Sequence, residues 1–240
     1  MTDTDSEPDS TDTDPSTDTA DSDPAAASGD SQTLLVSSLE ASTGKTAITL
    51  ALARLAAADG ESVGYMKPKG TRLQSNVGKT LDEDPLLARE LLDLDAEMHD
   101  LEPVVYSPTF VEQAIRGRED PAELRDRVRE AFETLATDHD RLFVEGGGRY
   151  DVGGIVDLAD ADIANLLDAR VLLVAPYEMP SDVDDIIAAA ETFGDRLAGV
   201  VFNDVPDAVY DSSRRTSSRS SRVGASPSTA CSRASGSCPA

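Results

Sequence analysis

Lysine, tryptophan and cysteine are scarce in this chain of 240 residues, and each shortage excludes something. Tryptophan is absent, and the two cysteines, Cys231 and Cys238, both lie near the C-terminus. The rest of the chain therefore has no thiol for a disulfide, a metal site or a nucleophile. No run of 18 apolar residues occurs, and the N-terminus has no secretory signal, so we expect a cytoplasmic protein without a membrane-spanning helix.

Acidic residues dominate the charge, with 46 Asp and Glu against 21 Lys and Arg and a formal net charge of −25. Binding to nucleic acid or to an anionic membrane is therefore not expected. Because the acids are spread along the whole chain, the pattern is typical of a protein from concentrated salt, where charge repulsion is screened. We interpret the chain as salt-adapted (halophilic); an acidic protein from a mesophile is the alternative.

Composition divides the chain into three parts. Residues 1–32 contain ten acids and no basic residue, so we expect a disordered acidic leader that cannot offset its chain entropy by burial; an interaction tail is the alternative. Residues 33–211 are expected to form one domain. Residues 212–240 contain 11 Ser, 5 Arg and no acid, and are also expected to be disordered.

The Ser/Arg-rich tail has two interpretations. A binding tail of this composition would be unusual on so acidic a chain. Reading a GC-rich gene out of frame yields Ser, Arg, Ala and Pro, and restoring one deleted G after the codon of Asp211 permits a helix, a turn and an apolar strand. Our hypothesis is that residues 212–240 are a frameshift product and that the native protein is longer.

Short apolar runs alternate with helical patterns through residues 33–211. Runs such as Val171-Leu172-Leu173-Val174 have no polar alternation, which is typical of strands covered by helices on both faces. The sequence therefore predicts an α/β fold, a doubly wound and mostly parallel sheet, with ligands at the carboxyl ends of the strands. Helices are expected at 46–58, 85–94, 121–137, 162–167 and 182–193, and strands at 34–37, 63–66, 142–144, 171–174 and 199–202.

Lys45 is one of only four lysines, all of which lie between Lys45 and Lys79, and it belongs to a Gly-Lys-Thr motif. An apolar run precedes this motif and an Ala/Leu-rich helix follows it, which predicts a phosphate-binding loop (P-loop) rather than an ordinary turn. In such a loop backbone N–H groups hold nucleotide phosphates, the lysine reaches the terminal phosphates and Thr46 would hold Mg²⁺. Leu39 or Ser38, depending on loop length, replaces the first glycine of the usual pattern.

Carboxylates and two further lysines follow other predicted strands. Lys67 and Lys69 flank Pro68 in a stiff turn, although two solvated lysines are the alternative. Asp82 and Asp84 precede a helix, where they could be Mg²⁺ ligands or N-caps. Glu145 ends an apolar strand before three glycines, a place where a carboxylate is costly to bury without a cation.

Five motifs together resemble the dethiobiotin synthetase family of P-loop proteins, over about residues 33–206. The resemblance is greatest to the dethiobiotin-synthetase-like domain at the N-terminus of phosphotransacetylases and in archaeal relatives that carry a DRTGG domain. The five motifs are Ser38-Leu39-Glu40-Ala41-Ser42-Thr43-Gly44-Lys45-Thr46, Met66-Lys67-Pro68-Lys69-Gly70-Thr71, Asp82-Glu83-Asp84, Val144-Glu145-Gly146-Gly147-Gly148 and Val201-Phe202-Asn203.

This resemblance implies roles for the motif residues. Lys67 would face the substrate and the transferred phosphate, and Asn203 would read the adenine edge, although it could instead cap a turn before Pro206. Lys69 departs from the synthetase pattern, which usually has an apolar residue there. The predicted site is catalytic Lys45 and Lys67; nucleotide-binding Ser38, Glu40, Ser42, Thr43, Gly44, Lys45, Thr46 and Asn203; substrate- or phosphate-binding Lys67, Lys69, Thr71, Gly146 and Gly147; and metal-binding Thr46, Asp82, Asp84 and Glu145.

Three functions remain open at this point. The first is an ATP- and Mg²⁺-binding domain that senses a nucleotide or metabolite and controls a phosphotransacetylase or DRTGG module, with a homodimer as the expected assembly. Glu145-Gly146-Gly147-Gly148-Arg149-Tyr150 favours it, because this stretch resembles that subgroup more than the true synthetases. The second is dethiobiotin synthetase, which uses ATP to carboxylate a diamine and close a ring. The third is a truncated product without function.

Overall fold

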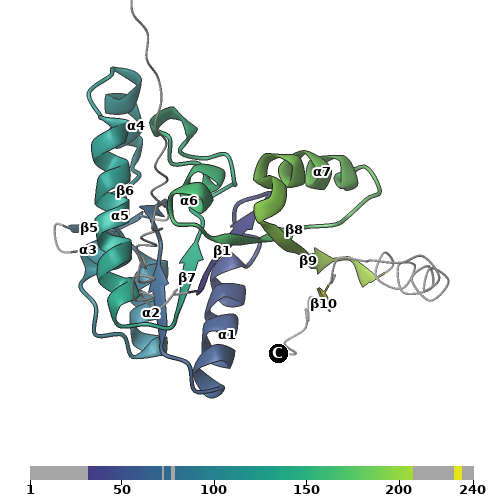
Figure 1. Ribbon diagram of the computed structural model, residues 1–240. Helices are drawn as coiled ribbons and strands as arrows, with labels where there is room; N and C mark the ends of the chain where they lie inside the picture. The colour runs from purple at the N-terminus through teal and green to yellow at the C-terminus, as the bar shows by residue number, and fades with distance from the viewer. Residues whose placement is uncertain (1–31, 72, 77–78, 208–229, 234–240) are drawn as a thin grey trace, which may run out of the picture. The chain divides into compact units, whose positions relative to one another are not determined.

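A parallel sheet of six strands forms the centre of the fold (Figure 1). The computed structural model describes residues 32–207, except 72 and 77–78, and residues 230–233. The strand order is β10-β9-β8-β1-β7-β2, and every pair of neighbours in it is parallel. The predicted doubly wound, mostly parallel α/β fold is thus confirmed. The strands are β1 (Gln32–Ser38), β2 (Val63–Met66), β7 (Arg141–Glu145), β8 (Arg170–Ala175), β9 (Leu197–Val205) and β10 (Ala230–Arg233).

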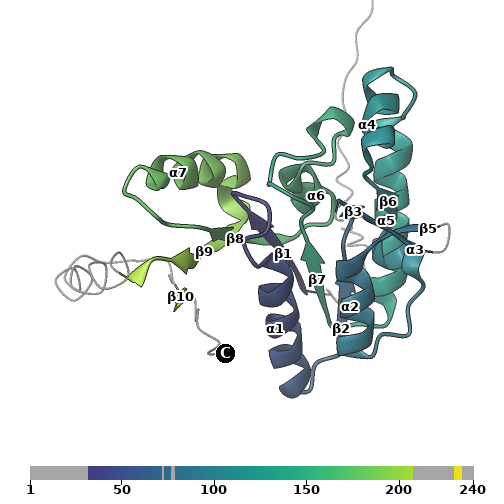
Figure 2. The same ribbon diagram turned by 180° about the vertical axis from the view of Figure 1, so that it is seen from behind.

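Helices cover both faces of this sheet, as Figures 1 and 2 show from opposite sides. On one face, α1 (Lys45–Ala58) and α2 (Glu83–Leu92) pack on β1, β2 and β7, where Tyr65 and Phe143 are buried beneath them. On the other face, a larger core joins the sheet to α5 (Pro121–Thr137), α6 (Asp160–Leu166) and α7 (Asp182–Phe193). Burial on two faces explains why the strand sequences are continuously apolar.

Small elements extend the region between β2 and α5. They are β3 (Lys69–Gly70), which pairs with β6 (Val104–Val105), the antiparallel pair β4 (Leu73–Asn76) and β5 (Lys79–Asp82), and the helices α3 (Met98–Leu101) and α4 (Pro108–Ile115). Two single turns of 3₁₀ helix, Gly154–Val156 and Gly194–Arg196, complete the elements. Among these small elements, β3 and β5 place Lys69 and Asp82 next to the carboxyl ends of β2 and β7.

The Ser/Arg-rich tail, which was expected to be disordered, contains one strand. Ala230–Arg233 form β10, which pairs in parallel with β9, although the tail composition predicts no regular structure. The physical reason is that β9 would otherwise present a row of unpaired backbone groups at the edge of the sheet. The acidic leader and the rest of the tail lie outside the described residues.

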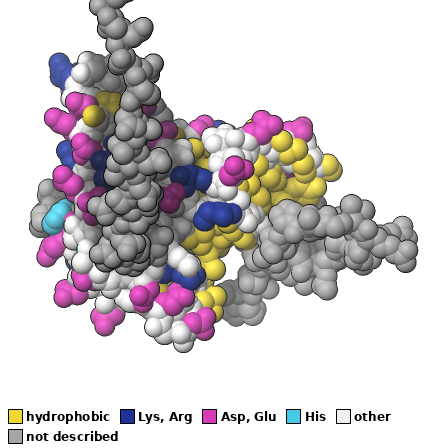
Figure 3. Space-filling view, viewed as in Figure 1, with side chains coloured by type: hydrophobic (Ala, Val, Ile, Leu, Met, Phe, Trp, Pro, Cys, Tyr) yellow, Lys and Arg dark blue, Asp and Glu magenta, His cyan; other side chains and the backbone are white. Residues whose placement is uncertain are grey.

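The surface of the described part carries acids in scattered positions. Figure 3 shows Asp and Glu side chains spread over one face, with Lys and Arg between them and apolar side chains over α7. Exposed apolar residues of that helix include Val183 and Ile187. Within the described residues, no helix combines the length and the apolar character needed to cross a membrane.

Candidate functional site

The loop between β1 and α1 has the backbone of a phosphate-binding loop. Ser42 and Gly44 adopt positive φ angles of 63° and 86°, so the turn is made there and not at Ser38 or Leu39, where the usual first glycine is missing. A left-handed Ser costs about 1–2 kcal/mol, which a rigid loop must offset elsewhere. Gly44 caps α1, and the first turn of that helix points its N–H groups toward the site.

Lys45 lies across the loop and is buried, with only 7 % of its surface exposed. Its Nζ donates to Ser38 Oγ and to the carbonyl of Gly148, both at 2.7 Å. Burial lowers the pKa of Lys45, while the nearby carboxylates of Asp160 and Glu145 act in the opposite direction. A buried ammonium held by two neutral oxygens is well placed to exchange them for phosphate oxygens.

Thr46 and Glu145 meet at the carboxyl ends of β1 and β7. Thr46 Oγ1 donates to Glu145 Oε1 at 2.7 Å, and the Tyr65 hydroxyl donates to Glu145 Oε2 at 2.8 Å. Burial raises the pKa of Glu145 to about 6, although Lys67 and these two hydroxyl donors favour its charged form. The same burial, together with the charge of Glu145, raises the pKa of Tyr65 well above its ordinary value.

Lys67 is surrounded by carboxylates and is 1 % exposed. Its Nζ lies 2.9 Å from Asp82 Oδ2 and 3.8 Å from Glu145 Oε1, and it forms a hydrogen-bonded ion pair with Asp84. Burial alone would lower the pKa of Lys67, but the acidic neighbours outweigh it and the pKa is raised. The alternative of solvated lysines is thereby excluded for Lys67.

Asp82 also caps α2, since its Oδ1 accepts from the N–H of Asp84 at 3.0 Å. The capping alternative for Asp82 is therefore confirmed, and its role as a Mg²⁺ ligand stays a prediction. Glu102 supports this turn, because its Oε2 accepts from the N–H of Asp82 at 3.1 Å. Burial raises the pKa of Glu102 to about 7.

Hard oxygen ligands of the kind that Mg²⁺ takes are therefore present. Among the described residues, no group of three or more His, Cys, Asp or Glu is placed to hold a metal ion. Lys67 Nζ lies between two of the carboxylates, 2.9 Å from Asp82 and 3.8 Å from Glu145. Thr46 and Glu145 remain a suitable pair, since Mg²⁺ in nucleotide sites is bound through one or two protein oxygens, phosphate oxygens and waters. The donor set thus fits this ion.

The remaining predicted residues divide between the cavity and its surroundings. Lys69 pairs with Asp160 and does not line the cavity, and the N–H of Gly146 donates to the carbonyl of Val36 in the sheet. Asn203 lies at the loop, where its amide donates to the carbonyl of Thr43 at 2.8 Å. A cavity of about 630 Å³ is lined by nine of the predicted residues and by Gly148, whereas Ser38, Thr43, Gly147 and Asp82 are not part of its lining. The nine are Ser42, Gly44, Lys45, Thr46, Lys67, Thr71, Asp84, Glu145 and Gly146.

Several residues at the site were not predicted from the sequence, among them four with polar contacts to the predicted residues. Tyr65 contacts Glu145, and Gly148 contacts Lys45. Glu102 accepts from the N–H of Asp82, and Asp160 accepts from Lys69. Gly148 could have been found as the third glycine of its motif. Neither acid carries a signal in a sequence with 46 acidic residues.

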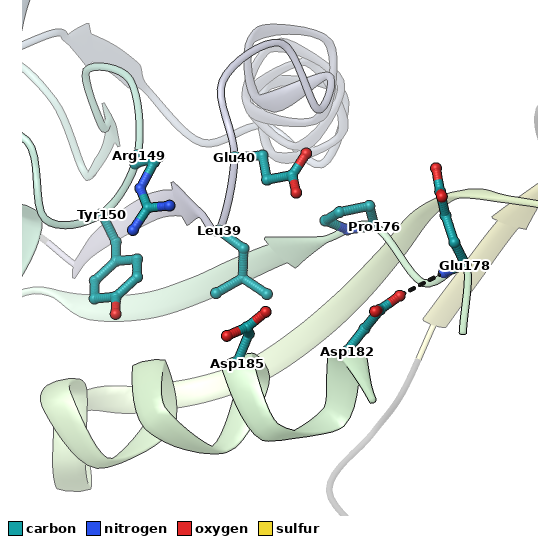
Figure 4. A pocket seen from close by; sticks show the side chains of 8 residues that line it. All are labelled: Leu39, Glu40, Arg149, Tyr150, Pro176, Glu178, Asp182 and Asp185. Carbon is teal, nitrogen blue, oxygen red and sulfur yellow. Dashed lines mark hydrogen bonds between the residues drawn. The ribbon is translucent and has the colours of Figure 1, made fainter. Parts of the chain in front are cut away.

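A second hollow, of about 210 Å³, lies between the loop and α7 (Figure 4). Glu40 enters it from the loop, and Asp182 and Asp185 enter it from α7 (Figure 4). Four of its eight lining residues are acids, so a polyphosphate would be repelled there. Glu40, which the sequence predicted to bind the nucleotide, thus lines this acidic hollow and not the cavity that contains Lys45.

Comparison with known proteins agrees with this geometry. The model of a family described as an AAA domain matches residues 32–229. The ATP-dependent dethiobiotin synthetase of Streptomyces avermitilis is 34% identical over 146 residues, which cover 59% of this chain and 58% of that protein. The corresponding protein of Streptomyces coelicolor is 32% identical over 182 residues, 73% of this chain and 72% of that protein.

A phosphate acetyltransferase of Haemophilus influenzae is also similar, with 29% identity over 193 residues. The match covers 77% of this chain but only 26% of that much longer protein, so it concerns one part of it. The resemblance inferred from the motifs is confirmed by these matches. The chain belongs to the AAA-domain family matched here and is a nucleotide-binding P-loop domain of the dethiobiotin-synthetase-like type.

Proposed function

We propose that this chain is an ATP- and Mg²⁺-binding domain of the phosphotransacetylase-associated type, which senses a nucleotide or small metabolite and regulates a partner module. The observation that carries the proposal is the buried Lys45, held across a phosphate loop beside the Thr46–Glu145 pair. On binding, the ammonium would exchange Ser38 and Gly148 for the terminal phosphates.

Thr46 and Glu145 would hold Mg²⁺, with Asp84 as the nearest further carboxylate in the cavity. When bound, the ion offsets negative charge on the phosphate oxygens. Lys67 would orient the ligand beside the terminal phosphate while its three carboxylate neighbours keep it protonated and fixed. Asn203, already hydrogen-bonded to the loop, would contact the base.

Two features favour a regulatory domain over the synthetase. Glu145-Gly146-Gly147-Gly148-Arg149-Tyr150 resembles the phosphotransacetylase-associated subgroup, and the chain is similar to part of a phosphate acetyltransferase. Lys69, where the synthetase pattern is usually apolar, forms a buried ion pair. A phosphotransacetylase or a DRTGG module would be the regulated partner, and a second copy of this chain the expected assembly.

Dethiobiotin synthetase itself is the second candidate. It is favoured by the 34% and 32% identity to proteins of that name and by the shared Lys67 and Glu145. This activity would require turnover that depends on a diamine and bicarbonate.

Calorimetry with ATP and Mg²⁺ in molar KCl tests the proposal. The parent is expected to bind, and Lys45→Ala is expected to release no heat. Arg54→Ala is the matched control, because it removes an exposed cation from the same helix and should bind as the parent does. Equal heats for the parent and Lys45→Ala would reject the proposal. Release of ADP that depends on 7,8-diaminononanoate and bicarbonate would select the synthetase instead.

A further inference from the structure

Lys69 and Asp160 form a second buried ion pair, behind the wall of the nucleotide cavity. Lys69 Nζ lies 2.6 Å from Asp160 Oδ1, and these side chains are 1 % and 0 % exposed. Neither residue lines the cavity, so we expect both to act on a ligand there through other residues. Breaking such a pair leaves a buried charge without compensation. We therefore look for the role of both residues in the segments that they hold in place.

Asp160 connects three segments that are distant in sequence. Its second oxygen, Oδ2, accepts from Ser37 Oγ at 2.6 Å, at the end of β1. Its backbone N–H donates to the carbonyl of Tyr150 at 2.9 Å, in the loop that follows the three glycines. Asp160, at the start of α6, therefore holds β1 and β3 through its carboxylate and the glycine loop through its backbone N–H.

The glycine loop is packed tightly against this pair. A Cβ atom on Gly146 would lie 2.1 Å from Asp160 Oδ2, and one on Gly147 would lie 2.5 Å from the carbonyl of Lys69. Neither position can carry a side chain without displacing the pair. Gly146 and Gly147 therefore allow the side chain of Asp160 and the backbone of Lys69 to lie close to their own backbone.

The held loop is the one that places the phosphate-binding groups. Glu145 immediately precedes it and accepts from Thr46, and Gly148 follows two residues after Gly146 and accepts from Lys45 Nζ. Ser37 likewise adjoins Ser38, the other partner of Lys45. Both oxygen partners of the P-loop lysine are thus one or two residues from a group fixed by Asp160 or Lys69.

We propose that Lys69 and Asp160 are positioning residues for the nucleotide site, acting as one unit that fixes Glu145, Gly148 and Ser38 around Lys45 and Thr46. The inference rests on the proposed function, because its readout is nucleotide affinity. It gives Lys69 a role through Asp160 in place of the direct phosphate contact that the sequence suggested. It also explains a lysine at a position where the resembled synthetases are usually apolar.

Titration with ATP and Mg²⁺ in molar KCl tests this pair, at a temperature where every variant is folded by circular dichroism. Lys69→Met and Asp160→Asn are each expected to weaken ATP affinity about 10- to 100-fold, the effect typical of removing a group that orients the ligands of a metal. The double variant should lose little more than either single variant, because the two residues act together. Ser37→Ala should shift affinity in the same direction by less.

Arg141→Met is the matched control for a purely structural effect. Arg141 begins the strand that Glu145 ends, and its Nε lies 2.7 Å from Glu61 Oε2 in a half-buried ion pair. Its loss should lower the melting temperature and leave ATP affinity unchanged.

Parent-like affinity in Lys69→Met and Asp160→Asn would overturn the inference, as would additive losses in the double variant. Should Asp160→Asn not fold, Lys69→Met and Ser37→Ala decide by the same criterion. The failure of the proposed function is distinguishable, because it would show as unchanged ATP binding in Lys45→Ala.

Discussion

Replacing Lys67 by Met should destabilise the protein more than almost any other single substitution. The change keeps an unbranched side chain of nearly the same length but removes the cation between Asp82, Asp84 and Glu145, all at most 3 % exposed. Removing one partner of a buried ion pair costs about 3–5 kcal/mol, because the remaining charge has no compensation. We expect a loss in that range in the free energy of unfolding at pH 8.

The loss should depend on pH in a definite direction. Burial raises the pKa of Glu145 to about 6 in the folded parent, above its ordinary value, and Lys67 is the largest influence that lowers it. A carboxyl group with a raised pKa binds its proton more tightly when folded, so its contribution to stability is lost as pH rises through the folded pKa. Without Lys67 this pKa rises further, and the destabilisation should therefore be smaller at pH 5 than at pH 8.

Urea unfolding followed by circular dichroism at pH 5 and pH 8 measures both effects without nucleotide. Arg129→Met is the control, because this cation pairs with Asp126 on the exposed surface of α5 and should cost less than about 1 kcal/mol at either pH. A loss for Lys67→Met below about 1 kcal/mol at pH 8 would refute the reasoning. So would a loss that is equal at both pH values.

Three further predictions concern the loop, the glycines and the net charge. Asn203→Ala should weaken ATP binding about tenfold and reduce the preference for ATP over GTP in competition titrations, since one or two hydrogen bonds to the base would be lost. Gly146→Ala should cost at least about 1–3 kcal/mol in urea unfolding, because its Cβ would lie 2.1 Å from Asp160 Oδ2, whereas Gly154→Ala meets nothing within 4 Å and should be neutral. The melting temperature should rise between 0.1 M and 2 M KCl as the repulsion within a charge of −25 is screened, and a flat or falling profile would contradict salt adaptation.

The central fold could be predicted because its signals are local. Continuous apolar runs and the helices between them identify five of the six strands of the sheet, all but β10, and the main helices, and the glycine-lysine-threonine motif identifies the loop. The helix α4 was missed although it begins with an N-cap serine, Ser107, followed by Pro108 at its first position, which is a recognisable start signal. The short pairs β3–β6 and β4–β5 have no comparable pattern, because two to four residues cannot show a period.

Site residues could be predicted from the sequence only where they belong to a recognisable motif. Lys45, Lys67 and Glu145 lie together as expected, since the carboxyl ends of parallel strands meet at one edge of the sheet. The partner of Lys69 could not be predicted, because Asp160 lies 91 residues further along the chain and resembles every other acid at a helix start. Contacts of this kind depend on tertiary packing alone.

The surroundings of three of the four lysines suggest why lysine is kept at these positions. Lys45, Lys67 and Lys69 are all at least nine-tenths buried, and each ammonium makes at least one short contact with an oxygen. An ammonium is a compact charge with three donors, whereas a guanidinium is a wide planar fork that needs room for five. We therefore expect that arginine, which supplies most of the cations elsewhere in the chain, does not fit these three positions.

Lys67→Arg should therefore behave as a disruptive change, although it keeps the charge. The wider group cannot stay within hydrogen-bonding distance of Asp82 and Asp84 and also remain beside Glu145, so we expect ATP affinity to fall about tenfold or more. Arg54→Lys, an exchange of the same kind on the exposed side of α1, should change neither stability nor binding. Parent-like ATP binding and unfolding in Lys67→Arg would show that charge alone matters at this position, and that the shape of the cage does not explain why lysine is kept there.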